Sequence, residues 1–560
     1  METIDASLAP QGYRLEVSDD GVLVVGADEA GLGHARATLA QLRHRANAPD
    51  GAAPRTLPVC RVEDWPDFAV RGVMLDVSRD RVLSTDTLFA LVDRLAGWKI
   101  NQLQLYMEHT FAYAGHEDVW SHADPYTASD MHALDAHCRS RGVELVANQN
   151  TLGHYERWLR LERYRPLAIA PDGFDWVFGI HRPALTLDPA NPEAFGLVSD
   201  LLGQLVPQLH STRVHIGLDE PWELSPERRG EWVRWLRALR ELPVLANREL
   251  LVWGDVPAVH HELLAELPDG VTVCEWGYEA NHPFEQRTAR LEAAGVPFWV
   301  CPGTSSWTSI SGRVDNMIGN IAAAATAGVA HGADGLLVTD WGDMGHHQQP
   351  CVSDPGLAAA AAFGWCAASH AGLGADDLAT LLDVHCYDDP SRQTGRAVVG
   401  LGQAYRMIGP RPPNMSALAL PYLLPQWPMG RGVTDGLSAS DLDAVRTLVH
   451  DTLAALERAR PGRGDGPLVL EEVAATADTL DLACRDLDLR LRGDGTLASI
   501  PDADRDALAT ELGVRIEVYR RLWLERCRPG GLSDSTAWFE HLLSCYRTGR
   551  ADRSWFGPFG

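Results

Sequence analysis

Between residues 71 and 370 the chain alternates short apolar runs with longer amphipathic stretches, and this alternation constrains the fold more than any other feature of the sequence. The apolar runs are rich in Val, Leu and Ile, as is typical of strands buried in a parallel sheet. We expect eight strands, at residues 71–77, 101–107, 143–149, 213–219, 249–255, 271–277, 297–303 and 334–342. Helical periodicity separates them, for example at 85–98, 130–141 and 283–295. Eight such units predict an α/β fold of the (β/α)8 TIM barrel type, whose core usually takes about 250 residues.

The alternative α/β fold is a doubly wound open sheet. It would not normally need eight units, and no glycine-rich phosphate-binding sequence follows the first strand. The flanking sequence differs from the barrel on both sides, with strand-like runs and one helical stretch before it and mainly helical periodicity after it. We therefore predict a small α/β domain at 1–67, the barrel at 68–372 and a helical C-terminal region at 373–560.

Composition excludes several classes of partner. A net charge of -27 argues against a nucleic acid, whose phosphates need a basic face. No apolar run approaches the roughly 20 residues that cross a bilayer, and the N-terminus lacks the basic and apolar segments of a secretory signal. The ten cysteines are scattered singly, which favours free thiols in a reducing compartment over a disulfide framework or a zinc cluster. We expect a soluble cytoplasmic protein with no membrane partner.

Polar and aromatic residues gather where the expected strands end. In a TIM barrel these carboxyl ends face the active site. Arg79, Glu108, His154, Asp219, Glu220, Trp253, Trp276 and Trp341 follow one strand after another. Indole faces stack on the apolar faces of a pyranose, while carboxylates and Arg bind its hydroxyls. The set predicts a sugar site at the mouth of the barrel.

The segment HIGLDEPWEL, residues 215–224, places two carboxylates side by side at the end of the fourth expected strand. Two protein carboxylates that cleave a glycosidic bond ordinarily lie about 5 Å or more apart, across the sugar ring. Neighbours in sequence cannot readily straddle a ring in this way. The pair makes chemical sense if the second reacting group belongs to the substrate.

HIGLDE resembles the His-x-Gly-x-Asp-Glu signature of glycoside hydrolase family 20, the β-N-acetylhexosaminidases, and RGVMLDVSR with DWPDFAVRG resembles the family's first barrel strand and its lead-in. LYMEHTF, CPGTSSWTSISGR and DWGDMGHHQQP are similar to a divergent bacterial branch. The resemblance spans roughly residues 61–370. It implies an exo-acting, retaining enzyme that removes terminal β-linked GlcNAc or GalNAc through an oxazolinium ion, without a metal or other cofactor.

The resemblance also implies roles for single residues. Glu220 would be the general acid/base, and Asp219 would hold the 2-acetamido N–H and orient its carbonyl oxygen toward the anomeric carbon. Arg79 matches the residue that binds the 3- and 4-hydroxyls. Asp343 matches an acid that reaches the 4- and 6-hydroxyls. The residues expected to wall the acetamido pocket and the sugar face are Trp253, Trp276 and Trp341.

The sequence departs from the family pattern at three strands. At strand three the usual Asp-x-Pro-Gly-His reads Asn150-Thr-Leu-Gly-His154, so that an amide replaces the carboxylate partner of His154. At strand two QLYMEHTF replaces a His-rich motif, and either Glu108 or His109 would stand in. Strand seven lacks the family's Tyr-x-Asp, whose Tyr hydroxyl binds the acetamido carbonyl. Trp307 lies in the segment that follows this strand, and Tyr278, after strand six, is expected to supply the hydroxyl instead.

Three alternative functions stay open at this point: a glycosidase for a modified or deacetylated 2-amino sugar, a non-catalytic sugar-binding barrel, and a metal hydrolase. The metal hydrolase would use His109, His154, His346 or His347 as ligands, although the last two are better interpreted as loop histidines. The partner that we expect is a glycan or aminosugar glycoside. The sequence decides neither its linkage nor whether the C-terminal region closes the site or forms a homodimer.

Overall fold

A small sheet and one helix form the N-terminal part of the computed structural model, which describes residues 1–46, 57–176, 181–430, 432–552, 555 and 557. The elements are β1 (Glu2–Ile4), β2 (Tyr13–Ser18), β3 (Gly21–Gly26), α1 (Glu29–Ala46) and β4 (Cys60–Asp64). The strand order is β1-β3-β2-β4, with β1 parallel to β3 and the other pairs antiparallel. Leu32 and Leu39 of α1 pack against Tyr13 and Leu15 of the sheet and against Trp365, which ends the last barrel helix.

Eight parallel strands close into a barrel, which confirms the predicted (β/α)8 TIM barrel. They are β5 (Val70–Asp76), β6 (Gln102–Met107), β7 (Glu144–Gln149), β10 (Arg213–His215), β11 (Glu249–Trp253), β12 (Val271–Trp276), β13 (Phe298–Cys301) and β14 (Gly335–Asp340). The pairing of β14 with β5 closes the ring. Every residue of β5, β6 and β14 is buried, because helices cover these strands outside and side chains fill the barrel inside.

The barrel helices follow their strands as the periodicity predicted. They are α2 (Thr85–Gly97), α4 (Ala128–Ser140), α6 (Pro192–Leu205), α7 (Gly230–Arg240), α8 (Asp255–Val259), α9 (Phe284–Ala293), α10 (Val314–His331) and α11 (Asp354–Trp365). In α2, Ser84 caps the N-terminus by accepting a hydrogen bond from the backbone of Thr87, and Leu88, Leu91 and Leu95 face the core. The capping residue and the apolar spacing together explain where this helix begins and which face it buries.

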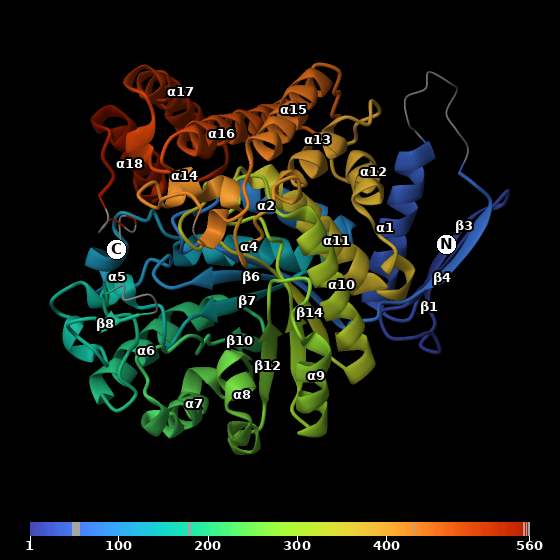
Figure 1. The fold of residues 1–560 in the computed structure, drawn as a ribbon. Helices are drawn as coiled ribbons and strands as arrows, with labels where there is room; N and C mark the ends of the chain where they lie inside the picture. Colours follow the sequence, from blue (N-terminus) through green and yellow to red (C-terminus); the bar gives the residue numbers. More distant parts are fainter. Residues whose placement is uncertain (47–56, 177–180, 431, 553–554, 556, 558–560) are drawn as a thin grey trace.

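The C-terminal region is helical and lies along one side of the barrel, at the top of Figure 1. It contains α12 (Ala375–His385), α13 (Thr394–Leu401), α14 (Leu420–Leu423), α15 (Ala439–Leu456), α16 (Gly466–Arg492), α17 (Asp502–Arg526) and α18 (Leu532–Thr548). The predicted loop at 460–467 separates α15 from α16. Among the described residues, no helix is both long enough and apolar enough to cross a membrane.

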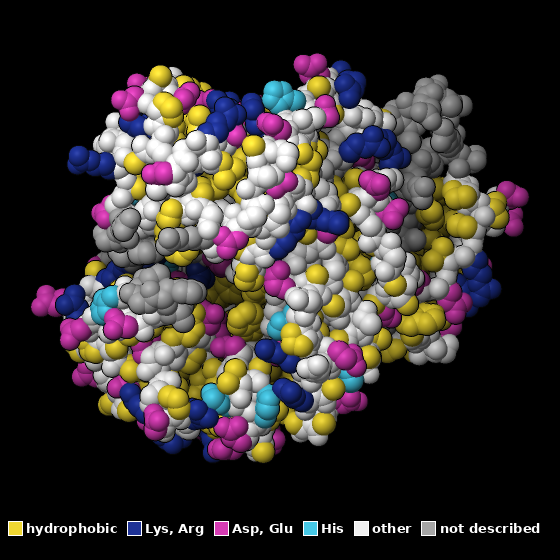
Figure 2. Space-filling view, viewed as in Figure 1, with side chains coloured by type: hydrophobic (Ala, Val, Ile, Leu, Met, Phe, Trp, Pro, Cys, Tyr) yellow, Lys and Arg dark blue, Asp and Glu magenta, His cyan; other side chains and the backbone are white. Residues whose placement is uncertain are grey.

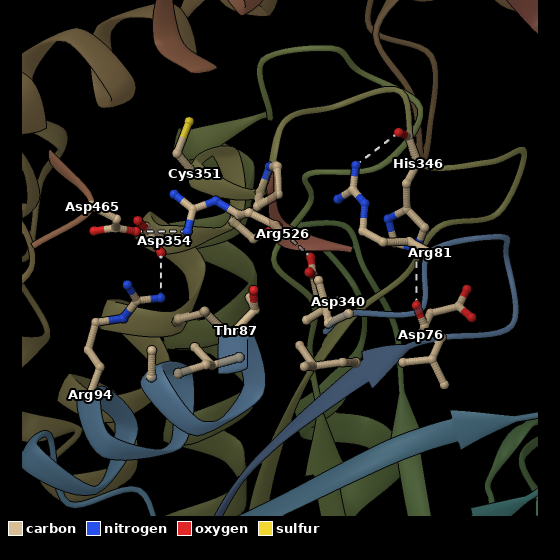
Figure 3. Close-up of a pocket in the computed structure, with 18 of the residues that line it drawn as sticks. Asp76, Arg81, Thr87, Arg94, Asp340, His346, Cys351, Asp354, Asp465 and Arg526 are labelled. Atoms are coloured by element: carbon tan, nitrogen blue, oxygen red, sulfur yellow. Dashed lines mark hydrogen bonds and ion pairs between the residues drawn. The ribbon is translucent and has the colours of Figure 1, made fainter. Parts of the chain in front are cut away.

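Charged side chains join the barrel to the C-terminal region around a small cavity (Figure 3). Arg463, in the loop before α16, pairs with Asp354 of α11 at 3.3 Å and so links the two parts. Arg94 of α2 pairs with the same carboxylate at 3.0 Å, and Arg526 of α17 pairs with Asp465 at 2.7 Å. Arg81, in the loop after β5, donates to the carbonyl of His346 at 2.9 Å. Because these groups are largely withdrawn from water, removing one partner would leave the other charge buried and unpaired, which costs more than breaking an exposed ion pair.

Candidate active site

The chain leaves β10 through a left-handed turn. The sequence predicted a strand to residue 219, but β10 ends at His215, because Gly217, Leu218 and Glu220 have φ values of 69°, 73° and 49°. For residues other than glycine such values cost about 1–3 kcal/mol each and persist only where neighbours enforce them. Here the backbone N–H of Glu220 donates to Asp255 Oδ2 at 3.0 Å, and that of Trp253 donates to the carbonyl of Gly217 at 2.9 Å.

This turn brings Asp219 and Glu220 to one point. Successive side chains of a strand point to opposite faces, so an extended chain would have separated the two carboxylates. Instead, Asp219 Oδ2 lies 3.1 Å and Glu220 Oε2 lies 3.6 Å from the same atom, His154 Nε2. The left-handed backbone is therefore what allows neighbouring acids to serve one site.

Asp219 is buried and held on both carboxylate oxygens. Asn150 Nδ2 donates to its Oδ1 at 2.6 Å, and His154 Nε2 donates to its Oδ2 at 3.1 Å. Burial raises the pKa of Asp219, but the charge of His154 and the two hydrogen bonds outweigh burial and leave this pKa below its ordinary value. The carboxylate is accordingly ionised and fixed in orientation.

Glu220 has a different environment from its neighbour. Its side chain is 28% exposed, and it lies beyond hydrogen-bonding distance of His154 Nε2. Burial raises the pKa of Glu220 to about 7, and the nearby Asp219 carboxylate acts in the same direction. Glu220 can thus carry a proton near neutral pH while Asp219 cannot.

Arg79, Glu108 and His154 continue the network from the carboxylates across the mouth. Arg79 Nη1 lies 3.0 Å from Glu108 Oε1, and Arg79 Nη2 lies 3.2 Å from His154 Nδ1. The guanidinium lies over the rings of Tyr106 and Trp341, at 5.1 and 5.6 Å from their centroids. Of the two strand-two candidates, the structure places Glu108 in this network.

The aromatic residues predicted for the site form one cluster, but they differ in how much surface they offer. Trp276 and Tyr278 are half-buried and stacked, with ring centroids 5.2 Å apart, and the Tyr278 hydroxyl accepts a hydrogen bond from Trp341 Nε1 at 2.7 Å. Trp253 and Trp307 are each 1% exposed and lie packed within the cluster. Figure 2 shows a hollow with hydrophobic side chains below the C-terminal helices.

Asp343 is exposed at the mouth and is contacted by the C-terminal region. Asn414, in the loop before α14, donates from Nδ2 to Asp343 Oδ2 at 3.3 Å. The same amide accepts from Trp307 Nε1 at 3.0 Å, and the backbone N–H of Asn414 donates to Glu279 Oε1 at 2.7 Å. A residue beyond the barrel therefore bridges two of the predicted site residues.

Comparison with known proteins identifies the family to which the chain belongs. Residues 68–302 match the family model described as "Glycosyl hydrolase family 20, catalytic domain", and residues 2–65 match "Glycosyl hydrolase family 20, domain 2". The chain belongs to glycoside hydrolase family 20. The two matches together take in more than half of its length, including the carboxylate pair and the N-terminal sheet.

Relatives with a described activity are distant. The family 20 chain is 24% identical to a β-N-acetylhexosaminidase of Cellulomonas fimi, over 54% of this chain and 60% of that one. It is 23% identical to the β-hexosaminidase subunit β of Felis catus, over 42% of this chain and 46% of that one. The chain thus spans about half the length of these two relatives.

Solved structures share the fold. The structure of a family 20 β-N-acetylhexosaminidase from Streptomyces coelicolor aligns with a TM-score of 0.51 at 22% identity, covering 70% of this chain and 82% of that one. A family 20 exo-β-N-acetylglucosaminidase from Vibrio harveyi, solved in complex with N-acetylglucosamine, gives 0.53 at 18% identity and covers 68% of each chain.

Sequence reasoning missed three residues of this family 20 site. Asn150 appeared only as the loss of a carboxylate, whereas its amide holds Asp219 directly. Asp255, which accepts from the backbone of Glu220, directly follows Trp253-Gly254 at the end of β11, a position that could have been inspected. Asn414 carries no local signal, because it lies outside the barrel and reaches the site only through the fold.

The histidines considered as metal ligands do not gather. His109 and His346 are buried, and burial holds the pKa of each well below its ordinary value. His346 Nε2 lies 3.0 Å from the carbonyl of Asp76, and His347 packs against Trp538. In the part of the chain that the structure describes, no three His, Cys, Asp or Glu side chains are grouped as metal ligands.

Asn414 gives a first testable expectation. Asn414→Ala removes the contacts with Asp343 and Trp307, and we expect kcat/KM on a terminal N-acetylhexosaminide to fall about tenfold, mainly through KM. Asn414→Asp keeps an acceptor for Trp307 but turns a carboxylate toward Asp343. If the Asp343 contact matters, Asn414→Asp is at least as damaging as Asn414→Ala. Near-normal kinetics of Asn414→Asp would assign the effect to Trp307 instead.

Proposed function

We propose that the protein is an exo-acting, retaining β-N-acetylhexosaminidase that removes terminal β-linked GlcNAc or GalNAc by substrate-assisted catalysis. The observation that carries this proposal is the convergence of the Asp219 and Glu220 carboxylates on His154 Nε2, in environments that shift their pKa values in opposite directions. Paired groups whose environments push their pKa values apart divide into a charge stabiliser and a proton donor. Here Asp219 stays ionised, and burial raises the pKa of Glu220 to about 7.

The first chemical step joins these roles to the substrate. Asp219 accepts the 2-acetamido N–H and so directs the amide carbonyl oxygen to the anomeric carbon. As the carbonyl oxygen forms its bond to that carbon, the glycosidic C–O bond breaks, and the leaving oxygen takes the proton of Glu220. The resulting oxazolinium ion is positively charged, and the buried, oriented carboxylate of Asp219 stabilises that charge.

The second step returns the site to its starting state. Water attacks the anomeric carbon from the face that the leaving group vacated, and ionised Glu220 accepts a proton from that water. The C–O bond to the acetamido oxygen breaks, the amide is restored, and the product keeps its β configuration. Two inversions at one carbon give net retention. Adjacent carboxylates suffice, because the substrate supplies the nucleophile.

Other side chains at the mouth support binding of a terminal sugar. Arg79 carries a fixed positive charge between Glu108 and the aromatic cluster, and Asp343 is exposed on the same side. The half-buried stack of Trp276 and Tyr278 offers an apolar surface, and the Tyr278 hydroxyl lies within the cluster. These groups fit an amphipathic ring that carries an acetamido substituent.

The test is hydrolysis of the 4-nitrophenyl β-glycosides of GlcNAc, GalNAc and 2-amino-2-deoxyglucose. We expect release of 4-nitrophenol from one or both acetamido glycosides, with inhibition by an acetamido-thiazoline that imitates the oxazolinium ion. Preference for the free amine, without inhibition by the thiazoline, would favour the deacetylated-sugar alternative. Calorimetric binding of GlcNAc without turnover of any glycoside would favour the non-catalytic barrel, and activity lost on chelation would favour the metal hydrolase.

The pH dependence follows from the two carboxyls. Glu220 must be protonated to donate, and its pKa is raised to about 7, so kcat/KM should be highest below pH 7 and fall as the pH rises above it. The lowered pKa of Asp219 places the acid limb below the usual range of aspartate. A profile of kcat/KM between pH 4 and 9, with circular dichroism at each pH, measures both limbs. An increase in rate through pH 7–8 contradicts the assignment of Glu220.

A further inference from the structure

An exposed tryptophan lies immediately beside the proposed proton donor. Trp222 is 40% exposed, although large apolar side chains are usually withdrawn from water. Its backbone N–H donates to the carbonyl of Glu220 at 2.8 Å, which ties it to the left-handed turn that positions the carboxylates. The backbone of Trp222 is therefore fixed beside that of Glu220, and its side chain is open to solvent.

Trp222 is not a mobile surface residue, because a second element supports it. Trp176, next to the short hairpin strand β8 (Phe174–Asp175), stacks on Trp222 with ring centroids 5.2 Å apart and an interplanar angle of 27°. The guanidinium of Arg182, in β9 (His181–Arg182), lies 5.3 and 5.4 Å from the two ring centroids. Arg182 is itself fixed by Glu156 at 2.6 Å.

The two segments that carry these rings are also joined by the side-chain carboxylate of Glu223. Glu223, directly after Trp222, accepts hydrogen bonds from the backbone N–H groups of Leu185 and Thr186 at 2.8 and 3.0 Å. Charge-assisted bonds of this kind are stronger than neutral ones. We call Trp176, Trp222 and Arg182 the aromatic platform; the contacts among its members hold its geometry, which lowers the entropic cost of binding a ligand.

From these contacts we infer that the aromatic platform is the binding subsite for the leaving-group sugar of an oligosaccharide substrate. The inference rests on the proposed function, in which Glu220 protonates the oxygen that links the terminal sugar to the next one. That next sugar must lie on the Glu220 side of the scissile bond, where the turn holds Trp222. An indole face suits the apolar face of a pyranose, and the adjacent guanidinium suits its hydroxyls.

The experiment compares two substrates that differ only in the leaving group: N,N′-diacetylchitobiose, which leaves a pyranose, and 2,2,2-trifluoroethyl β-GlcNAc, which leaves no ring. The measured quantity is the ratio of their kcat/KM values. We expect Trp222→Ala to lower this ratio about tenfold, consistent with the loss of one stacking contact. Trp222→Phe should restore most of it, and Trp176→Ala should lower it in the same direction because Trp176 supports Trp222.

Trp65→Ala is the matched control, since it removes an indole that is 53% exposed in the segment between β4 and β5. It should leave the ratio unchanged. A ratio for Trp222→Ala within twofold of the wild type would overturn the inference. If the wild type hydrolyses neither substrate, the proposed function fails, and the platform is then judged by tryptophan fluorescence: saturable quenching by triacetylchitotriose that Trp222→Ala abolishes supports it, and its absence in the wild type refutes it.

Discussion

Glu220→Gln should lower turnover of an unactivated disaccharide by roughly 10³-fold, within the range usual for loss of a general acid/base. The physical reason is that a glutamine amide has the shape of the protonated carboxyl, but its N–H protons are far too weakly acidic to be transferred to the leaving oxygen. A 4-nitrophenolate leaving group needs little protonation, so its release should suffer much less. The measurement is kcat/KM over a series of β-GlcNAc glycosides whose leaving groups span several pKa units.

Adding azide to the Glu220→Gln assay tests the general-base role of Glu220 separately. The anion attacks the anomeric carbon without a general base, so it should restore turnover of the 4-nitrophenyl glycoside by Glu220→Gln and yield the β-glycosyl azide. Glu227→Gln, which changes an exposed glutamate in the same loop, should behave as the wild type. An equal loss across all leaving groups, with no response to azide, would indicate that Glu220 has a structural role.

Asp219→Asn should lower kcat/KM on acetamido substrates by roughly 10²–10³-fold, the effect usual for loss of one oriented electrostatic stabiliser. The carboxylate is buried and held by Asn150 and His154, so the site is arranged around a negative charge that asparagine lacks. Because the thiazoline imitates the oxazolinium ion, its inhibition constant should rise by a comparable factor.

Thermal unfolding and thiazoline inhibition together distinguish loss of the acetamido contact of Asp219 from loss of the fold. Thermal unfolding of Asp219→Asn should remain cooperative, since asparagine has nearly the same volume as aspartate. An unchanged thiazoline inhibition constant in a variant with reduced kcat/KM would contradict the assignment, because Asp219 would then act on something other than the acetamido group. The effect should be smallest on the free-amine glycoside, which has no amide for Asp219 to orient.

Sequence periodicity predicted the barrel because the signal repeats eight times and each strand needs only its own residues to be recognised. The residues at which strands end were harder to predict from the sequence. Residues 213–219 read as one strand, yet β10 ends at His215. Gly217 was the one local sign of a break, and nothing in the residue type of Leu218 indicates its left-handed φ. The carboxylate pair could be identified from its residue types, but its convergence on His154 depends on that turn.

Hydrogen bonds between residues far apart in the chain could not be predicted from the sequence. The loss of an acid at Asn150 read as a weakened partner for His154, whereas the amide donates to Asp219 and leaves His154 free to do the same. Asn414 contacts Asp343 from 71 positions further along the chain, a spacing that no local pattern encodes. Such contacts exist only once helices of the C-terminal region have packed on the barrel.

The bridge from Asn414 to Asp343 and Trp307 bears on how this chain can be recombined. A protein shortened after the last barrel helix would lose an amide that lines the substrate entrance, along with the helices that keep its loop in place. Chimeras between relatives would therefore have to exchange barrel and C-terminal helices as one cassette. Conversely, the loop bearing Asn414 offers a compact target for libraries aimed at altered sugar preference, since it touches the entrance while leaving the two reacting carboxyls untouched.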